Sequence, residues 1–430
     1  MVQIPAFEVE QWMDAYENTP GVLNIAETCA SSISIDQLRE FHKNSNNSDA
    51  GPPPPIVDFS QPMTYGAILG SDELRRNIAA LYAEEESNES GSNTNNGSAL
   101  APQGVIVTQG AIAANHLVFY SLVGPGDHVV CVFPTYQQLY TIPETLGAEV
   151  SLWKLKVEDE YIPDVGELEK LIKSNTKMIV INNPNNPTGA TTPAPILSKI
   201  IQLARKHDLI VLSDEVYRPL FHSNPPSSSN SPSSSSSTPP PPSALSLGYE
   251  KAVVTSSMSK AWALAGIRVG WAASRSRDII TKLAVARDYT TISVSQLDDQ
   301  VARYALSEAV RPALLARNVA LARTNLALLE DFVRTHADVC SWVKPTAGTT
   351  AFVRFCRRDG NGGGKGEPVD DEAFCKDVLE KTKVMFLPGG RCFGHGRDFR
   401  GYVRIGYVSD TEVLRRALER LSAYVAENLG

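Results

Sequence analysis

Short apolar segments alternate with amphipathic segments through the middle of the chain. Six Val/Ile-rich runs predict strands: residues 103–109, 127–134, 176–183, 209–215, 251–257 and 268–274. Residues 111–123 and 196–207 repeat their apolar positions with the spacing of a helix. Because the strand segments are almost continuously apolar and are separated by helices, they predict an α/β fold with a mainly parallel sheet that is buried on both faces.

The pattern changes in the last third of the chain. Residues 294–336 form one long helical tract, which we expect to break near Pro312 because proline disrupts the interior of a helix. Shorter strand-like segments follow at residues 349–355, 383–390 and 402–407. They predict a second, smaller region of mixed helices and strands.

The length supports two domains, because 430 residues exceed what one ordinary hydrophobic core accommodates. We expect a small domain formed by both chain ends, residues 1–55 and 316–430, and a large domain at residues 56–315. Four segments rich in Ser, Asn, Gly or Pro predict surface insertions, because they hold too few apolar residues to stabilise an ordered conformation: residues 42–55, 84–98, 224–243 and 357–368.

Composition narrows the classes of function. A formal net charge of -8 argues against nucleic acid as the main partner. No apolar run is long enough to span a bilayer, and the acidic residues 1–18 do not resemble a secretory signal. The 6 cysteines are scattered without a CxxC pair and the 7 histidines are not clustered, so we expect a reduced, cytoplasmic protein without a metal site.

Candidate chemistry collects just after the predicted strands, where open α/β sheets place their ligand sites. Gly110 opens a helix, so backbone N–H groups there are able to approach an anion closely. Tyr136 is placed to stack on a planar ring, although a core or rim tyrosine explains it as well. Asn186 lies in NNPNNPTGA, whose two Asn-Pro pairs exceed what turn formation requires. Asp214 ends a very apolar strand, where its carboxylate needs either a ligand or a salt bridge.

The stretch SSMSKAWALAGIRVGW, residues 256–271, holds a second set of candidates. Ser257 and Arg268 are suited to binding a phosphate by hydrogen bond and charge. Between them, Lys260 is expected to have its pKa lowered by neighbouring cations, which leaves an amine able to attack a carbonyl. The alternative for this stretch is a solvated helix start with an exposed lysine.

In order and wording these motifs resemble the fold-type I pyridoxal-phosphate enzymes, specifically the class I and II aminotransferase family. The resemblance rests on NPNNPTG, SDEVY and SxSKxxxLAGxRVGW, and it covers residues 65–407 apart from the insertions. It implies a large domain with a mainly parallel seven-stranded sheet flanked by helices, and a smaller α+β domain from both chain ends. It also implies pyridoxal 5′-phosphate as cofactor, with Lys260 as the Schiff-base lysine.

The resemblance also assigns roles at the cofactor. Asp214 keeps the pyridine nitrogen protonated, and Tyr136 stacks on the ring. Asn186 and Tyr217 hydrogen-bond the ring hydroxyl oxygen. The phosphate is held by Gly110, Ala111, Ser257 and Arg268.

Two further roles concern the substrate and the partner subunit. Arg404, in YVRIGY, matches the arginine that clamps the substrate α-carboxylate. Tyr65 matches a tyrosine that reaches the phosphate of the neighbouring subunit, which implies a homodimer. Near the N-terminus, Glu27 in LNIAETCASSIS either faces the substrate or is a helix-capping or surface glutamate. Trp262, Tyr65 and Phe393 are candidates for an apolar substrate pocket, although core packing explains each as well.

The implied reaction begins with removal of the α-proton by Lys260 while Asp214 keeps the ring cationic. Reprotonation at the cofactor then gives transamination, loss of a β-thiolate gives a C–S lyase, and loss of a γ-substituent gives ring closure as in the aminocyclopropane-carboxylate synthases. We expect an aminotransferase acting with a 2-oxo acid, and the other two reactions remain as alternatives because the same framework serves all three. A pyridoxal-phosphate-binding regulator or inactive homologue is disfavoured, because only a short acidic segment precedes the core and Lys260 is present.

Overall fold

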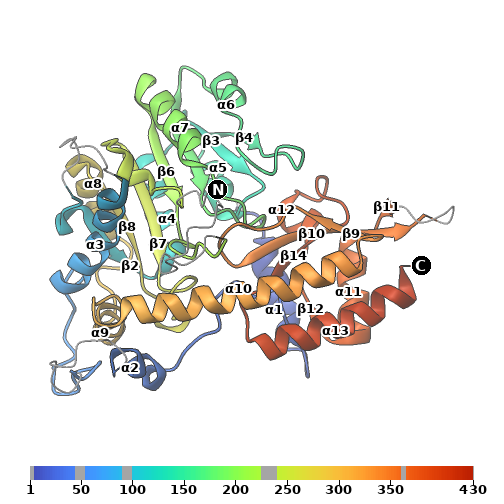
Figure 1. Cartoon of the computed structure of the whole chain (residues 1–430). Coiled ribbons are helices and arrows are strands. Elements are labelled where there is room, and N and C mark those ends of the chain that lie inside the picture. Colours follow the sequence, from blue (N-terminus) through green and yellow to red (C-terminus); the bar gives the residue numbers. More distant parts are fainter. Residues whose placement is uncertain (1–3, 44–53, 90–98, 224–239, 360–364, 430) are drawn as a thin grey trace, which may run out of the picture.

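The computed structural model describes residues 4–43, 54–89, 99–223, 240–359 and 365–429 (Figure 1). Within them the large sheet has seven strands in the order β2-β8-β7-β6-β5-β3-β4, and β8 runs antiparallel to the other six. The strands are β2 (Val105–Thr108), β3 (His128–Phe133), β4 (Glu149–Lys154), β5 (Thr176–Asn182), β6 (Ile210–Asp214), β7 (Ala252–Ser257) and β8 (Gly270–Ser274). The predicted α/β fold with a mainly parallel seven-stranded sheet is confirmed.

One strand of the large sheet is not among the strands predicted from the sequence. β4 pairs only with β3 and therefore lies at an edge of the sheet. Most of its residues are partly or fully exposed, and Glu149 and Lys154 are among them. An edge strand of this kind lacks the continuous apolar pattern by which its buried neighbours are recognised.

Alternate residues of the central strands face two different apolar cores. Val129 and Cys131 of β3 belong to the core under α4 and α8, whereas Val130 and Val132 belong to the larger core that contains α7. The helices and short 3-10 turns of this region are α3 (Asp72–Glu89), η1 (Pro102–Gly104), α4 (Gly110–Leu122), α5 (Gln138–Thr145), α6 (Val165–Leu171), α7 (Ala194–Lys206), η2 (Ala244–Leu247), η3 (Ala265–Ile267), α8 (Arg277–Arg287) and α9 (Gln296–Ala305). The sheet is thus buried on both faces, as the apolar runs predict.

Both chain ends contribute to a second region. β1 (Leu23–Asn24) pairs in parallel with β12 (Val384–Met385), and a second small sheet is built mainly from antiparallel pairs around β10. Its strands are β9 (Cys340–Trp342), β10 (Thr350–Arg358), β11 (Lys365–Pro368), β13 (Leu387–Pro388) and β14 (Tyr402–Gly406). The helices are α1 (Glu8–Tyr16), α2 (Ile35–Lys43), α10 (Arg311–Thr335), α11 (Asp371–Thr382), α12 (Gly389–Phe393) and α13 (Thr411–Asn428).

Helix α10 runs from beside the large sheet to the small one (Figure 1). The predicted break near Pro312 is confirmed, because α9 ends at Ala305 and Pro312 occupies the first turn of α10. The domain boundaries at residues 55 and 315 stay predictions. Among the described residues, no helix is both long and apolar enough to cross a membrane.

All four predicted insertions are narrower than expected, and helix α2 shortens the first of them because it continues to Lys43. Helix α3 continues to Glu89, and β10 and β11 pair with each other on either side of residues 360–364. Pro242 and Ser243 are buried, and the Ser243 hydroxyl caps η2 by accepting from the Leu245 N–H. Residues 44–53, 90–98, 224–239 and 360–364, where the remainder of the predicted insertions falls, lie outside the described residues.

Candidate active site

A cavity of about 460 Å³ opens at the carboxyl ends of the parallel strands. This is the edge of the sheet where α/β proteins bind ligands. Ten of the residues predicted from the sequence line it: Glu27, Ala111, Tyr136, Asn186, Asp214, Tyr217, Ser257, Lys260, Arg268 and Arg404. The fold therefore brings together positions that are far apart in the sequence.

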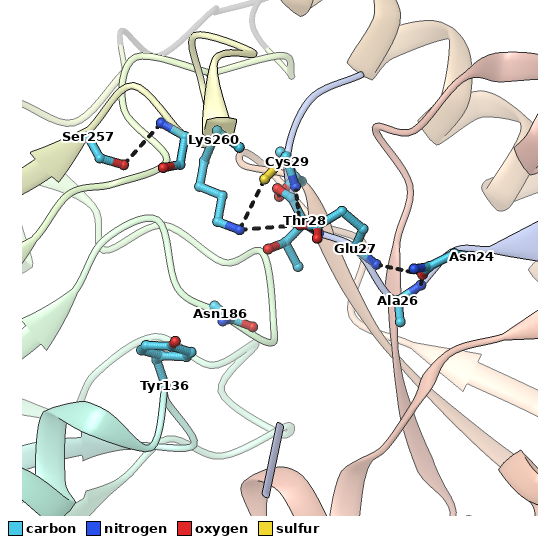
Figure 2. A network of polar contacts seen from close by, with 12 residues as sticks. Asn24, Ala26, Glu27, Thr28, Cys29, Tyr136, Asn186, Ser257 and Lys260 are labelled. Atoms are coloured by element: carbon cyan, nitrogen blue, oxygen red, sulfur yellow. Dashed lines mark hydrogen bonds and ion pairs between the residues drawn. The ribbon is translucent and has the colours of Figure 1, made fainter. Parts of the chain in front are cut away.

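Lys260 follows β7, and its ammonium group extends into the cavity toward the N-terminal segment (Figure 2). Nζ lies 3.4 Å from Glu27 Oε1 and 3.4 Å from Cys29 Sγ. The N-terminal segment is held there by backbone hydrogen bonds, from Ala30 N–H to the Lys260 carbonyl and from Gly406 N–H to the Ile25 carbonyl. Glu27 therefore faces the cavity, and its contact with a substrate stays a prediction.

The charges of this pair differ from the prediction. Burial would lower the pKa of Lys260, but the acidic groups Cys29 and Glu27 beside it raise that pKa above its ordinary value. Burial would raise the pKa of Glu27, but Lys260 and the N–H groups of Thr28 and Cys29 lower it to about 2. The expected lowering of the Lys260 pKa by neighbouring cations is wrong, because its nearest charged partner is a carboxylate.

Asp214 ends β6 with 3% of its surface exposed. Its carboxylate accepts hydrogen bonds from Asn115 Nδ2 at 3.0 Å and from the Val216 N–H at 3.1 Å. Asn115 is fixed in turn, because its Oδ1 accepts from the Thr255 hydroxyl at 2.5 Å. Burial raises the pKa of Asp214 to about 6 in spite of these bonds and of Lys260.

An anion site lies where β2 leads into α4. Gly110 has φ +82°, and a Cβ atom there would lie 2.8 Å from Arg268 Nη2, so the guanidinium lies directly against the first turn of the helix. Arg268 Nη1 donates to the Ala265 carbonyl at 2.9 Å and to Ser259 Oγ at 3.4 Å. The Ser257 hydroxyl accepts from the Ser259 N–H. A helix N-terminus, an arginine and two serines together suit a phosphate.

Polar side chains line the opposite wall. The Asn186 N–H donates to Asn182 Oδ1, and Asn186 Oδ1 accepts from Arg404 Nη1 at 3.2 Å. Tyr217 is 2% exposed, and burial raises its pKa. The Tyr136 hydroxyl donates to Glu10 Oε1 at 2.9 Å.

Arg404 is 3% exposed, and its positive charge is the one expected of a residue that binds the substrate α-carboxylate. Nη2 donates to the Ala26 carbonyl at 2.8 Å, whereas Nε has no hydrogen-bond partner among the described residues. A buried guanidinium with an unsatisfied N–H favours binding of an anionic ligand.

Three predicted residues lie away from this cavity. Tyr65 is 81% exposed and lines a separate, smaller cavity with Thr64 and Arg303. Trp262 and Phe393 are fully buried and belong to the main apolar core. Of the two alternatives for these residues, core packing accounts for both, and neither lines the described cavity.

Sequence reasoning missed several residues of the site. Asn115 and Ser259 lie inside motifs that the sequence singles out, so their spacing from Gly110 and Lys260 is a usable signal. Cys29, Thr28 and Asn182 also line the cavity. Within the described residues no group of three or more His, Cys, Asp or Glu side chains is arranged to hold a metal ion.

Known proteins resemble this chain along most of its length. The model of the family "Aminotransferase class I and II" matches residues 34–421. The capreomycidine synthase of Streptomyces vinaceus is 30% identical over 326 residues, which are 76% of this chain and 74% of that protein. The aspartate aminotransferase of Thermotoga maritima is 27% identical over 383 residues, covering 87% and 88% of the two chains.

A solved structure agrees with these matches. The structure of a pyridoxal-phosphate-dependent aminotransferase from Streptococcus suis superimposes with a TM-score of 0.81 at 34% identity, over 99% of this chain and 98% of that one. The predictions of fold class and of a pyridoxal-phosphate-dependent transferase are confirmed at the level of the family. The chain belongs to the class I and II aminotransferases, a family of pyridoxal-phosphate-dependent enzymes.

Proposed function

We propose that the cavity binds pyridoxal 5′-phosphate and that the protein transfers the amino group of an α-amino acid to a 2-oxo acid. The observation that carries this proposal is the arrangement of Lys260, Asp214 and Arg268 around one cavity. The residues fit the cofactor. The turn at Gly110 and Arg268 suits its phosphate, and the buried carboxylate of Asp214 suits its protonated ring nitrogen.

The bound cofactor supplies an electron sink for the carbon that loses its proton. Lys260 Nζ would hold the cofactor, and once the substrate amine displaces it, the freed Lys260 amine would take the α-proton of the substrate. Asp214 keeps its negative charge toward the ring, and the hydrogen bond from Asn115 fixes the direction of its carboxylate. Tyr217, Asn186 and Tyr136 would hold the ring of the cofactor.

Transamination is favoured over elimination because relatives over most of the chain are named aminotransferases. A ring-forming or eliminating reaction is the second candidate, since one relative at 30% identity is named a synthase.

A single-turnover experiment separates these reactions. The yellow holoenzyme is mixed with a panel of amino acids and cysteine S-conjugates in the absence of a 2-oxo acid. Conversion to the pyridoxamine form, reversed when a 2-oxo acid is added, is the expected result. Repeated release of thiol, pyruvate and ammonia would instead identify a C–S lyase, and repeated turnover to a cyclic product would identify a synthase.

Arg404→Lys is expected to raise KM for the amino acid about 10- to 100-fold with a smaller change in kcat, because an ammonium cannot make the bidentate contact of a guanidinium. Steady-state kinetics measures the two constants separately. Arg277→Lys, at an exposed position in the first turn of α8, is the matched control. A KM for Arg404→Lys equal to that of the control would remove this arginine from the substrate site.

We also infer that the protein is a homodimer, as members of the family usually are. The exposed segment around Tyr65 supports this, because Phe59, Met63 and Ile68 are exposed in it as well. Tyr65 then completes the phosphate site of the partner subunit. The cytoplasmic location stays a prediction from composition.

A further inference from the structure

We propose that the active site selects amino acids with a cationic side chain, a guanidinium or an alkylammonium, and that the carboxylates of α1 bind this group. The proposal rests on the proposed function and adds the substrate class to it. It starts from Glu10, Asp14 and Glu17, which line the same cavity as Lys260.

These three carboxylates form one acidic wall. Their spacing of four and three residues places them on one face of α1, beside the buried Val9 and Met13, and all three are exposed. Helix α1 is held against the small sheet from its other side, where Trp12 Nε1 donates to the Phe386 carbonyl at 3.1 Å. The wall therefore has a fixed position at the cavity.

Interactions within α1 do not explain why three carboxylates lie together on this face of the helix. Carboxylates four residues apart repel each other, and Asp14 and Glu17 lie at the negative end of the helix dipole, where α1 has no basic residue. Glu8 on the same helix forms an ion pair with Arg391 at 2.6 Å. In the parts of the chain that the structure describes, no ion pair involves Glu10, Asp14 or Glu17. Among the described residues, the Glu10 side chain accepts one hydrogen bond, from the Tyr136 hydroxyl.

Arg404 is a second, independent sign of a ligand in this cavity. It is 3% exposed, and its Nε has no partner among the described residues. With the α-carboxylate at Arg404 and the α-carbon at Lys260, two points of an amino acid are fixed. The side chain then extends toward the remaining wall of the cavity, to which α1 contributes.

The charges of the cavity favour a cation there. The proposed function pairs Arg268 with the cofactor phosphate, Asp214 with the ring nitrogen and Arg404 with the α-carboxylate. In the proposed function Lys260 binds the cofactor. Glu27 then no longer has the Lys260 ammonium as its ion-pair partner. Glu10, Asp14, Glu17 and Glu27 then face the substrate with no protein cation assigned to them. An acidic side chain would be repelled by these groups, and a cationic one attracted.

The test compares arginine with citrulline, which has nearly the same shape but a neutral ureido group. The holoenzyme is mixed with each amino acid, and the half-reaction is followed through the cofactor absorbance. Because three to four carboxylates act on one charge, we expect kcat/KM to be at least about tenfold higher for arginine than for citrulline. Only the arginine value should fall as ionic strength rises. Equal values, or a preference for aspartate, would overturn the proposal.

A triple variant, Glu10→Gln, Asp14→Asn and Glu17→Gln, tests whether the acidic wall causes the preference for arginine over citrulline. The arginine-to-citrulline ratio is expected to fall toward one and to lose its dependence on salt. Glu419→Gln, at an exposed position on α13, is the control and should keep the ratio of the wild type. Thermal unfolding checks the fold of the variant, and Glu17→Gln alone provides a milder form of the same test. A triple variant that is folded and keeps the wild-type ratio would overturn the role of α1.

The outcomes separate this inference from the proposed function. If citrulline and norleucine convert the cofactor as fast as arginine and lysine do, cationic selection fails while the aminotransferase remains. If no amino acid converts the cofactor of a yellow, folded holoenzyme, the proposed function fails, and the inference fails with it.

Discussion

Lys260→Ala is expected to abolish the absorbance of lysine-bound pyridoxal phosphate and to reduce turnover by about 10³-fold or more. The reason is that one amine serves both as the anchor of the cofactor and as the base for the α-proton. No other lysine lines the cavity among the described residues. The absorbance spectrum and the rate of the half-reaction measure the two roles separately.

The fold should tolerate this change. The Lys260 side chain is 24% exposed and its partner Glu27 is 46% exposed, so removal of the ammonium leaves no fully buried carboxylate behind. The pKa of Glu27 should then rise from about 2 toward its ordinary value. Lys199→Ala, at an exposed position on α7, is the matched control and should keep both colour and activity. A yellow, active Lys260→Ala enzyme would refute the proposed function.

Two residues of the site, Asp214 and Asn186, could be found from the sequence for the same physical reason. Asp214 interrupts an apolar run, and Asn186 lies in a turn with more Asn-Pro pairs than a turn requires, so each conflicts with the local pattern around it. Such local conflicts mark functional positions. They are visible in the sequence because the conflict lies within a few residues.

The N-terminal part of the site, Glu27 together with the acidic wall on α1, could not be predicted in the same way. Glu27 and Lys260 are 233 positions apart, and long-range contacts of the N-terminal segment, among them the backbone hydrogen bonds of Ala30 and Ile25, bring them together. A Cβ atom at Gly406 would collide with the Glu27 carbonyl, but nothing in the local sequence connects these positions. The acidic residues of α1 have the sequence pattern of a solvent-exposed helix face. The sequence pattern alone does not show that this face borders a cavity. The same limit led to the wrong direction for the Lys260 pKa.

Asp214→Asn is expected to lower kcat/KM about 10²- to 10³-fold, because the neutral amide no longer stabilises a protonated ring nitrogen. The substitution keeps the size of the side chain but not its two acceptors. Asn115 Nδ2 and the Val216 N–H now donate to different oxygens, so one of these donors would face the new amide NH₂ group. A loss of stability of about 1–3 kcal/mol follows from that unsatisfied contact. Asp159→Asn, at an exposed position in a turn, is the control.

The dependence on pH distinguishes loss of charge from loss of packing. Burial raises the pKa of Asp214 to about 6, so the cofactor-free folded state binds this proton more tightly than the unfolded chain, whose ordinary value is 3.8. The contribution of Asp214 to stability therefore grows as the pH falls from about 6 toward 3.8, and it is lost again as the pH rises through 6. Cofactor binding, which needs the ionised carboxylate, should weaken over the same fall in pH.

Both dependences should disappear in Asp214→Asn, because the amide does not titrate. Thermal unfolding of the cofactor-free protein and titration with pyridoxal phosphate between pH 4 and 7 measure them. If the variant kept the wild-type pH dependence of cofactor binding, another group would be responsible for it. Asp214 would then be a structural residue whose buried carboxylate serves the hydrogen bonds of Asn115 and Val216 alone.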